Sequence, residues 1–527
     1  MRPTKRSQAQ HGGSDQAEVI AFLSDPASYA TKPERVERCE THGALVFLAG
    51  EEAWKIKRAV RFPYMDFSTL DKRKAVSARE VEINRRTAPE IYLGCLPITR
   101  SRDGGLAFGG GGEPVEWAVR MRRFDQSALL SRIAGAGTLP PSLTRDLADA
   151  VYASHRAAPP ASLVEGAARF ERLIASVAET LAGVAGTLGA GRLQQLQTRV
   201  AAQVRHAAAV LDARAAAGCV RRCHGDLHLN NIVLWHGRPV LFDALEFNDD
   251  LATIDTLYDL AFVLMDLDIR GQRDAANAVL NRYLWRSGAA LDLRGLKALP
   301  LLVGLRSAIR AMVTAERAGQ ERGEAQTRHR EEAGRYLDAA LAHLAPPAPE
   351  LIAVGGLSGT GKSTLARALA HRIGPAPGAV HLRSDLERKS LLGVDETTRL
   401  GPEAYTKAAG EKVYAILCEK MSHVLTAGHA GIVDAVFARP EERAEIEQVA
   451  AKLGIPFRGL WLEASPHALL ARVEGRTGDA SDATPDVVRQ QLAYETGAFS
   501  ESWTRVDADA NPTATVEQAL RSLARCI

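Results

Sequence analysis

The sequence has few cysteines, and none of them is paired in a Cys-x-x-Cys motif. The six cysteines of the 527-residue chain are Cys39, Cys95, Cys219, Cys223, Cys418 and Cys526. Such sparse use is typical of a reducing compartment and excludes a disulfide-stapled scaffold. Cys219 and Cys223 are four residues apart, but no second ligand pair stands at the spacing of a zinc site, so we expect no structural metal there.

The sequence also lacks a long apolar run and a large net charge. No run approaches the roughly 20 apolar residues that a membrane span needs, and the basic start MRPTKRSQAQHGGSDQ (1–16) leads into no apolar segment. We expect residues 1–16 to be disordered, and the protein to be cytoplasmic with no membrane partner. The net charge of +3 is small for this length, so nucleic acid is not an expected partner either, and the oligomeric state stays open.

The remaining composition is that of a soluble protein with more than one domain. Apolar residues make up 46% and charged residues 24%, and the chain is too long for one ordinary core. The Pro-rich break HLAPPAPEL (343–351) predicts a boundary between domains at 17–345 and 346–527. Before the break, we expect strands at 44–50, 51–60 and 116–124, a helix at 77–88, and largely helical structure over 143–218 and 251–345. After it, strands alternate with helices, which predicts a parallel sheet covered on both faces.

The second domain opens with a phosphate-binding motif. GLSGTGKS (356–363) fits G-x-x-x-x-G-K-[ST], with the apolar stretch LIAV before it and the helical text STLARALA after it. In such a loop the backbone N–H groups and the helix N-terminus bind phosphate oxygens, the lysine reaches the β- and γ-phosphates, and the hydroxyl serves Mg²⁺. The residues predicted to bind nucleotide here are Gly356, Ser358, Gly359, Thr360, Gly361, Lys362, Ser363 and Thr364.

Two aspartates after later strands complete this candidate site. Asp434 ends the apolar stretch AGIVD, where a second metal-site residue belongs, and Ala435 follows it rather than the second acid of many ATPase motors. That absence favours transfer to a substrate. Asp385 in HLRSDLERK can accept a proton from a substrate hydroxyl, with Arg388 and Lys389 beside it to hold phosphate or an acidic substrate. A helix N-cap role for Asp385 is compatible with this role.

A basic helix end further along could form a lid. Arg472 and Arg476 lie on one face of ARVEGRTGDASDA, where they could close on a phosphoryl group or simply be solvent-exposed. Residues 350–527 resemble the small-molecule and polynucleotide kinase branch of P-loop enzymes, such as gluconate kinase. The resemblance rests on the phosphate loop, Asp385 and Asp434.

The first domain carries a different constellation, in CHGDLHLNNIVLW (223–235). Asp226 is followed five residues later by Asn231, and a predicted hairpin leads on to Asp243 in LFDALEF. In kinases of the protein-kinase type, one Asp accepts the proton of the acceptor hydroxyl, while an Asn five residues on and a second Asp across a hairpin hold Mg²⁺. We expect His224 and His228 to brace the loop rather than to act chemically.

These residues resemble the aminoglycoside phosphotransferase family over about 40–345, with TLYDLAF (256–262) matching the segment downstream. The resemblance implies that EEAWKIK carries the nucleotide-binding lysine, either Lys55, which the pattern favours slightly, or Lys57. It also implies that Glu80 pairs with that lysine, with Glu82 as the alternative, and that EWAVRMRRF (116–124) meets adenine.

The two resemblances together predict a fold and a reaction. We expect an α+β protein-kinase-like two-lobed domain followed by an α/β P-loop domain with a parallel sheet. Each would use ATP and Mg²⁺ to phosphorylate a hydroxyl of a small-molecule acceptor such as a sugar or amino sugar. In the alternatives, one domain is a regulatory nucleotide-binding module, or the P-loop domain is a nucleic-acid kinase. An acidic segment at Glu246, Asp249 and Asp250 would suit a cationic acceptor or be an ordinary solvated loop.

Overall fold

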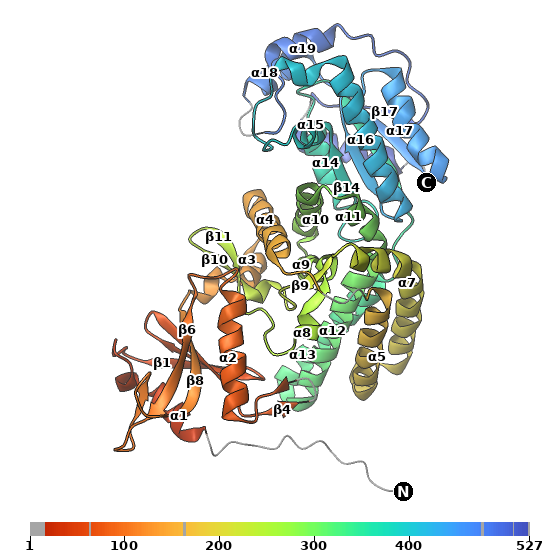
Figure 1. The fold of residues 1–527 in the computed structure, drawn as a ribbon. Helices are drawn as coiled ribbons and strands as arrows, with labels where there is room; N and C mark the ends of the chain where they lie inside the picture. Colours follow the sequence, from red (N-terminus) through yellow and green to blue (C-terminus); the bar gives the residue numbers. More distant parts are fainter. Residues whose placement is uncertain (1–15, 63–64, 162–164, 476–478, 510, 525–527) are drawn as a thin grey trace. The chain divides into compact units, whose positions relative to one another are not determined.

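The computed structural model describes residues 16–62, 65–161, 165–475, 479–509 and 511–524 (Figure 1). These residues form two compact units. The first comprises the described residues of 1–139, 150–162 and 218–263, and the second comprises those of 140–149, 163–217 and 264–527. Residues 1–15, where disorder was predicted, lie outside the described residues, and Gln16 is buried and donates to Glu116. The domain boundary at 345/346 stays a prediction.

The first unit is built on a six-stranded antiparallel sheet with the order β1-β2-β3-β8-β6-β7. Its strands are β1 (Val36–Glu40), β2 (Ala44–Ala49), β3 (Glu52–Lys57), β6 (Tyr92–Arg100), β7 (Leu106–Phe108) and β8 (Glu113–Arg122). The predicted strands at 44–50, 51–60 and 116–124 correspond to β2, β3 and β8. The sheet is apolar on both faces, because Phe47 and Trp54 belong to one buried cluster and Leu48 and Val119 to another.

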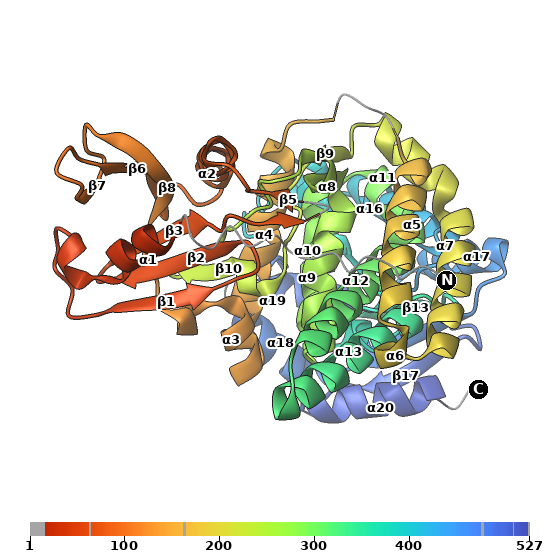
Figure 2. The same ribbon diagram turned by 90° about the horizontal axis from the view of Figure 1, so that it is seen from below.

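One long helix covers the second of these faces. Helix α2 (Leu70–Asn84) begins where the Thr69 side chain accepts a hydrogen bond from the Lys72 N–H, an N-cap that satisfies one free donor of the first turn. It buries Val81 in the same cluster as Val119 of β8, and Figures 1 and 2 show it alongside β8. The smaller elements of this part are α1 (Ala17–Ser24), η1 (Pro26–Ser28), β4 (Arg61–Phe62), β5 (Met65–Asp66), η2 (Gln126–Ala128) and α3 (Leu130–Ala136).

The polar stretch around Asp226 lies between two small antiparallel sheets. The first pairs β9 (Val220–Arg222) with β12 (Thr253–Asp255), and the second pairs β10 (Ile232–Trp235) with β11 (Arg238–Leu241). His236 and Gly237 connect β10 to β11 with φ of 47° and 77°, the left-handed conformation that two-residue hairpin turns require. The remaining elements here are η3 (Leu229–Asn231), α8 (Asp249–Ala252) and α9 (Thr256–Ile269), the last of which continues into the second unit.

The second unit contains most of the helical structure predicted for 143–218 and 251–345. Its helices before the Pro-rich break are α4 (Pro141–Ala157, shared with the first unit), α5 (Ala167–Gly183), α6 (Ala185–Leu188), α7 (Ala190–Ala216), α10 (Arg273–Ser287), α11 (Ala290–Gly295), η4 (Leu296–Ala298), α12 (Leu299–Gln320) and α13 (Gly323–His343). The continuous helical segment Ala290–Gln320 is long and apolar enough by length and composition to cross a membrane, although charged residues interrupt its apolar sequence. Of its most apolar window, 72% is buried inside the protein, as in the core helix of a soluble protein.

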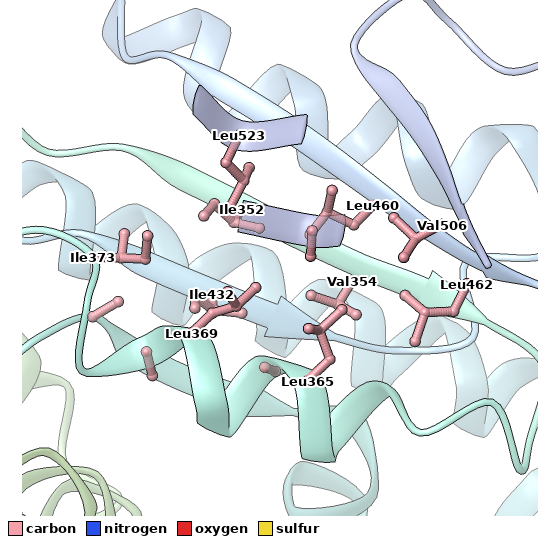
Figure 3. Packing of buried hydrophobic residues seen from close by; sticks show 14 of the residues in the cluster. Ile352, Val354, Leu365, Leu369, Ile373, Ile432, Leu460, Leu462, Val506 and Leu523 are labelled. Atoms are coloured by element: carbon pink, nitrogen blue, oxygen red, sulfur yellow. The ribbon is translucent and has the colours of Figure 1, made fainter. Parts of the chain in front are cut away.

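A five-stranded parallel sheet follows the break, with the order β14-β15-β13-β16-β17. Its strands are β13 (Leu351–Gly356), β14 (Val380–Arg383), β15 (Gly431–Asp434), β16 (Phe457–Glu463) and β17 (Trp503–Asp507). Strand β13 contains the apolar stretch LIAV of the sequence analysis, and β15 contains the last four residues of AGIVD. Figure 3 shows Ile352, Val354 and Ile432 from the central strands in one cluster with Leu365 and Leu369.

Helices accompany this sheet as the alternating pattern requires. They are α14 (Lys362–Ala370), α15 (Ser384–Leu391), η5 (Pro402–Tyr405), α16 (Lys407–Thr426), α17 (Pro440–Leu453), α18 (Pro466–Glu474), α19 (Pro485–Leu492) and α20 (Pro512–Ala524). The central strand β13 leads directly through the phosphate-loop sequence into α14. In a parallel sheet the loops at the carboxyl ends of the strands lie at one edge, so this connection and Asp434 belong to the same edge.

Candidate functional site

The first candidate site contains two lysines that share one glutamate. Lys55 and Lys57 are two apart on β3 and therefore on the same face of the strand. The Lys55 ammonium lies 2.8 Å from Glu80 Oε1, and that of Lys57 lies 2.6 Å from Glu80 Oε2. Glu80 projects from α2 and is fully buried, whereas Glu82 is 57% exposed and pairs with Arg79. The structure thus places Glu80, not the alternative Glu82, against both lysines.

The two lysines differ in their second partner. Lys55 lies 2.6 Å from Asp243 Oδ1, and Lys57, which is 2% exposed, pairs with Glu246. Burial opposes the ionisation of Glu80, but the charges of Lys55 and Lys57 outweigh it and lower the pKa of this carboxyl. For Glu246 burial prevails and raises the pKa despite Lys57. Of the two lysines, therefore, Lys55 connects Glu80 to the predicted metal ligand Asp243. The ammonium group of Lys57 is enclosed between Glu80 and Glu246.

The Asp226 loop is closed by hydrogen bonds within itself. Asn231 Nδ2 donates to the Asp226 carbonyl oxygen over 2.9 Å and to Asp226 Oδ2 over 3.1 Å. His224 is buried, its backbone carbonyl accepts from Leu245 N, and its Nε2 contacts the Phe242 carbonyl oxygen at 2.9 Å. These contacts tie the loop to the strand end that carries Asp243, as expected for a histidine that braces the loop.

Asp259 of α9 holds the backbone of this loop. Its two carboxylate oxygens accept from the N–H groups of His224 and Gly225, each over 3.0 Å. Gly225 has φ of 85°, and a Cβ there would lie 3.0 Å from the Cβ of Ala252, so the position requires glycine. Sequence reasoning gave Asp259 no role beyond its place in the TLYDLAF pattern.

Asp243 is fixed by its neighbours in an uncommon backbone conformation. Its φ of 59° lies in the left-handed region, which a non-glycine residue occupies only when its surroundings hold it there. The Tyr92 hydroxyl accepts from Asp243 N over 3.1 Å, and Asn84 Oδ1 accepts from Ala244 N over 2.8 Å. Partial burial opposes ionisation of the Asp243 carboxyl, but the charge of Lys55 outweighs it and lowers the pKa. Tyr92 and Asn84 were not found from the sequence.

The oxygens of this site fit a magnesium ion. The predicted metal ligands Asn231 and Asp243 offer an amide and a carboxylate oxygen, the hard donors that Mg²⁺ takes. The Asp226 and Asp243 side chains are 44% and 40% exposed, and the charge of Asp226 acts to raise the pKa of Asp243. Two neighbouring carboxylates of like charge that are open to solvent are suited to a cation.

A second group of potential metal ligands lies deeper. His155, Cys223 and Asp259 are buried and have their ligand atoms within 4.8 Å of one another. The Asp259 carboxylate already accepts two backbone N–H groups, and Cys223 Sγ donates to the Ile254 carbonyl oxygen. Burial also raises the pKa of the Cys223 thiol well above its ordinary value, which disfavours the thiolate that a metal would require. These contacts give the group a structural role.

The second candidate site is the loop between β13 and α14. Gly356, Gly359 and Gly361 have φ of 142°, 89° and 89°. A Cβ on Gly356 or Gly359 would lie 2.7 Å from a backbone carbonyl oxygen, so the curled loop requires glycine at both positions. Lys362 Nζ donates to the Leu357 carbonyl oxygen over 3.0 Å, and Thr360 Oγ1 donates to the same oxygen over 2.8 Å. Thr364 is exposed on the first turn of α14.

The loop has one partner that the sequence did not indicate. Ser358 N donates to Gln491 Oε1 of α19 over 2.7 Å, and Gln491 is 8% exposed. This N–H is one of those that a phosphate-binding loop offers to its ligand. The Gln491 side chain therefore accepts a hydrogen bond from a backbone donor of the loop.

Asp434 connects this loop to the neighbouring strand β14. Ser363 Oγ donates to Asp434 Oδ1 over 3.1 Å, and His381 Nε2 lies 2.5 Å from Asp434 Oδ2. Burial opposes ionisation of Asp434, but the hydrogen bond from His381 lowers the pKa of the carboxyl. Ser363 and Asp434 supply oxygens of the kind that a magnesium site in a P-loop enzyme uses, so they fit this ion. His381 lies between the apolar residues Val380 and Leu382 of β14, and a histidine at this place was the signal available in the sequence.

The other predicted residues of this half are distributed more widely. Asp385 lies in the first turn of α15, and burial, together with the charge of Asp434, raises its pKa. Arg388 donates to the Ala404 carbonyl oxygen. Lys389 is 1% exposed and bound to Asp482, so the expectation that it holds substrate is wrong because the ammonium is enclosed and neutralised. Arg472 donates to the Gly359 carbonyl oxygen over 3.5 Å.

The structure describes only one of the two arginines of the predicted lid. Arg472 lies on α18, and its donation to Gly359 places it beside the phosphate loop. Arg476 lies outside the described residues.

Family models match both halves of the chain. The model described as "Phosphotransferase enzyme family" matches residues 78–298, and the model described as "AAA domain" matches residues 351–497. The expected resemblance to two families and the expected fold class are confirmed. Uncharacterized proteins of Mycobacterium tuberculosis and Mycobacterium bovis are 30% identical to this chain over 472 residues, which cover 87% of this chain and 90% of each relative.

Solved structures are similar to parts of the chain. A gluconokinase from Sinorhizobium meliloti has 22% identity, covers 34% of this chain and 93% of its own, and has a TM-score of 0.26. Aminoglycoside 2'-phosphotransferase-IIIa has 12% identity, covers 62% of this chain and 99% of its own, and has a TM-score of 0.37.

Proposed function

Since the chain belongs to the family of its mycobacterial relatives and joins a phosphotransferase-family segment to an AAA-domain segment, we propose that it is an ATP-dependent kinase with two transfer sites. Both segments are of kinase type, so the protein is a phosphotransferase. The finer proposal is that each site moves the γ-phosphoryl group of ATP to a hydroxyl of a small-molecule acceptor, such as a sugar or an amino sugar.

The observation that carries the proposal is the arrangement around Lys55. One ammonium group lies against both Glu80 and Asp243, and Asp226 and Asn231 are hydrogen-bonded to each other on the loop tied to Asp243. In the proposed reaction Lys55 leaves Asp243 to bind nucleotide phosphate while Glu80 keeps it oriented. Asp226 accepts the proton of the acceptor hydroxyl, and Asn231 and Asp243 hold Mg²⁺, which neutralises charge on the phosphates when bound.

The second site is proposed to work with other residues. The glycine loop and Lys362 would bind the phosphates, Ser363 and Asp434 would hold Mg²⁺, and Asp385 would accept the proton from the acceptor. Its raised pKa suits a base that works near neutral pH. Arg472, beside the carbonyl of Gly359, would contribute positive charge as the phosphoryl group moves.

Two of the three carboxylates in the acidic segment, Glu246 and Asp249, give little support to a cationic acceptor. Glu246 is paired with Lys57, and Asp249 accepts from Arg222 over 2.7 Å and lies 3.3 Å from Arg79. Carboxylates that are already neutralised by arginine or lysine have no charge to spare for an amine. We therefore propose that recognition of the acceptor rests on hydroxyl groups more than on amino groups.

The test uses the full-length protein with one site inactivated at a time. Purified wild type, Asp226→Asn and Lys362→Ala are incubated with γ-labelled ATP, Mg²⁺ and a panel of sugars, amino sugars and nucleosides. Each variant should lose transfer to one set of acceptors and keep the other, and the double variant should lose both. The matched controls are Glu82→Gln and Asp486→Asn, two exposed carboxylates on helices near the respective sites.

The outcomes separate the proposal from its alternatives. If only one single variant abolishes all transfer, the other half is a regulatory nucleotide-binding module. If oligonucleotides, but no small molecule, accept phosphate in a Lys362-dependent manner, the P-loop half is a nucleic-acid kinase. If the double variant transfers phosphate as fast as wild type, the proposed sites are wrong.

A further inference from the structure

We infer that helix α10, which belongs to the phosphotransferase-family segment, positions the metal site of the P-loop half through Asn281 and His381. Residues 273–287 of this helix and the whole P-loop sheet belong to the second compact unit. The inference rests on the proposed function of the P-loop site. It adds positioning residues on α10, among them Asn281, that lie outside the 351–497 segment matched by the AAA model, whereas His381 lies within that segment.

The first step from α10 to the metal site is at the edge of the parallel sheet formed by β14. Strand β14 is an edge strand, because the order begins β14-β15. An edge strand leaves every second residue with an N–H and a carbonyl that no other strand binds. Here Asn281 Oδ1 accepts from His381 N over 2.7 Å, and Asn281 Nδ2 donates to the Ala379 carbonyl oxygen over 3.2 Å. One asparagine side chain thus imitates a neighbouring strand.

A second asparagine on the same helix reinforces this contact. Asn277 lies one turn before Asn281, is 4% exposed, and also donates to the Ala379 carbonyl oxygen, over 3.0 Å. A Cβ on Gly378 would lie 2.9 Å from Asn277 Nδ2, so the glycine permits this close approach. Residues four apart share one face of a helix, so a single face of α10 is committed to the edge of β14.

The second step runs from this edge to the metal site. The backbone of His381 is held by Asn281, while its side chain reaches Asp434 Oδ2 at 2.5 Å. A carboxylate is an acceptor only, so Nε2 of His381 carries the hydrogen in this contact. The other oxygen, Oδ1, accepts from Ser363 Oγ over 3.1 Å. A continuous series of contacts therefore leads from α10 to both proposed metal-site residues.

Further contacts join the same helix to α15, which carries Asp385. Trp285 Nε1 donates to the Leu386 carbonyl oxygen over 3.4 Å, next to Asp385 in the chain. Arg282 lies 2.8 Å from Glu396, beyond the end of α15, and 2.8 Å from Asp149 of α4. The two elements that position the proposed metal ligand and the proposed base are thus both held by α10.

The expected consequence is a metal affinity that depends on α10. Hydrogen bonds that orient a ligating side chain change metal affinity by about 10–100-fold when they are removed. Without His381, the buried Asp434 carboxylate loses the partner that fixes its orientation. Without Asn281, the His381 backbone is freed at the sheet edge, and the His381–Asp434 contact loosens with it.

The experiment measures Mg²⁺-dependent nucleotide binding rather than turnover. The full-length Asp243→Ala protein serves as background, so that binding of a fluorescent ATP analogue reports the P-loop site. In this background, Asn281→Ala and His381→Ala should raise the Mg²⁺ concentration for half-maximal binding by about 10-fold or more. Binding without the metal should be unchanged. The conservative His381→Gln, which keeps a donor, should recover most of the effect.

The controls separate positioning from general damage. Asp274→Ala alters an exposed residue in the first turn of α10 and should leave the Mg²⁺ dependence unchanged. Melting temperatures are measured for every variant. If His381→Ala does not fold, Asn281→Ala and His381→Gln still test the inference, because both retain a side chain that can face Asp434.

One result would contradict the inference alone, and another would contradict the proposed function as well. If Asn281→Ala and His381→Ala leave the Mg²⁺ dependence as in the background protein, or weaken binding equally with and without the metal, the inference is wrong. If the background protein binds the analogue no better than its Lys362→Ala derivative, the P-loop half binds no nucleotide, and the proposed function fails together with the inference.

Discussion

Removal of the Lys57 ammonium is expected to destabilise the first unit strongly. The side chain is 2% exposed and lies between Glu80, which is fully buried, and Glu246, which is 8% exposed. Lys57→Met keeps the apolar stem but leaves one oxygen of each carboxylate without its cation. Removing one partner of a buried ion pair costs about 3–5 kcal/mol, because the remaining charge stays out of water.

The expected change in melting temperature follows from the size of the unit. For a unit of about 200 residues, a loss of 1 kcal/mol in unfolding free energy lowers the melting temperature by about 2–4 °C. The melting temperature of Lys57→Met should therefore be about 10 °C below that of wild type. The double variant Lys57→Met/Glu246→Leu should recover at least half of this loss, because it removes the charge that was left unpaired and Lys55 still neutralises Glu80. Scanning calorimetry of the full-length protein measures both.

Lys55→Met provides the contrast. Lys55 is more exposed, at 11%, and Glu80 keeps Lys57 when it is lost. This variant should therefore melt closer to wild type but lose nucleotide binding at the first site in a Lys362→Ala background, whereas Lys57→Met should retain binding below its melting temperature. A Lys57→Met protein that melts within about 2 °C of wild type would refute the reasoning, since this shift corresponds to about 1 kcal/mol or less. So would a double variant no more stable than the single one.

Three further predictions concern other parts of the chain. Gln491→Ala frees the Ser358 N–H, so the P-loop site should bind ATP analogue about 2–10-fold more tightly, the value of one net hydrogen bond; weaker binding in fluorescence titration would contradict this. Gly225→Ala forces a side chain onto φ of 85° against Ala252, so the first site should lose phosphotransfer while the P-loop site keeps its own. Burial lowers the pKa of His429 to about 4, against 6.5 for a free histidine. Between these two pH values the unfolded chain binds more protons than the folded one, so the stability of the protein falls as the pH drops through this window. The loss attributable to His429 is about 3 kcal/mol, and calorimetry at pH 7 and 4.5 should show a smaller acid shift for His429→Leu than for wild type.

The sequence alone determined the local chemistry wherever a motif is contiguous. The curled loop at 356–363 needs glycine at fixed positions. The hairpin that separates Asn231 from Asp243 has turn residues, His236 and Gly237, that are adjacent in the chain. The alternation of strands and helices after the Pro-rich break predicted the parallel sheet for the same reason, because period and order are written in the sequence. These predictions needed no information from distant residues.

Only the tertiary structure decided which distant groups meet. That Lys55 and Lys57 share Glu80, and that Glu246 is enclosed instead of facing an acceptor, depends on the packing of α2 and the segment after Asp243 against β3. In the second half, the partners of Asp434 and Ser358 are His381 and Gln491, one on another strand and the other over 100 residues away.

The physical reason is that side-chain pairing between elements has no period in the sequence. The asparagine at position 281 looks like an ordinary helix residue in the sequence, and its role appears only when Ala379 and the edge strand β14 lie beside it. Buried donors and charges must find partners wherever the fold brings them. The residue types in the sequence therefore predicted the chemistry of both sites. The fold determined which neighbouring side chains orient the reactive groups.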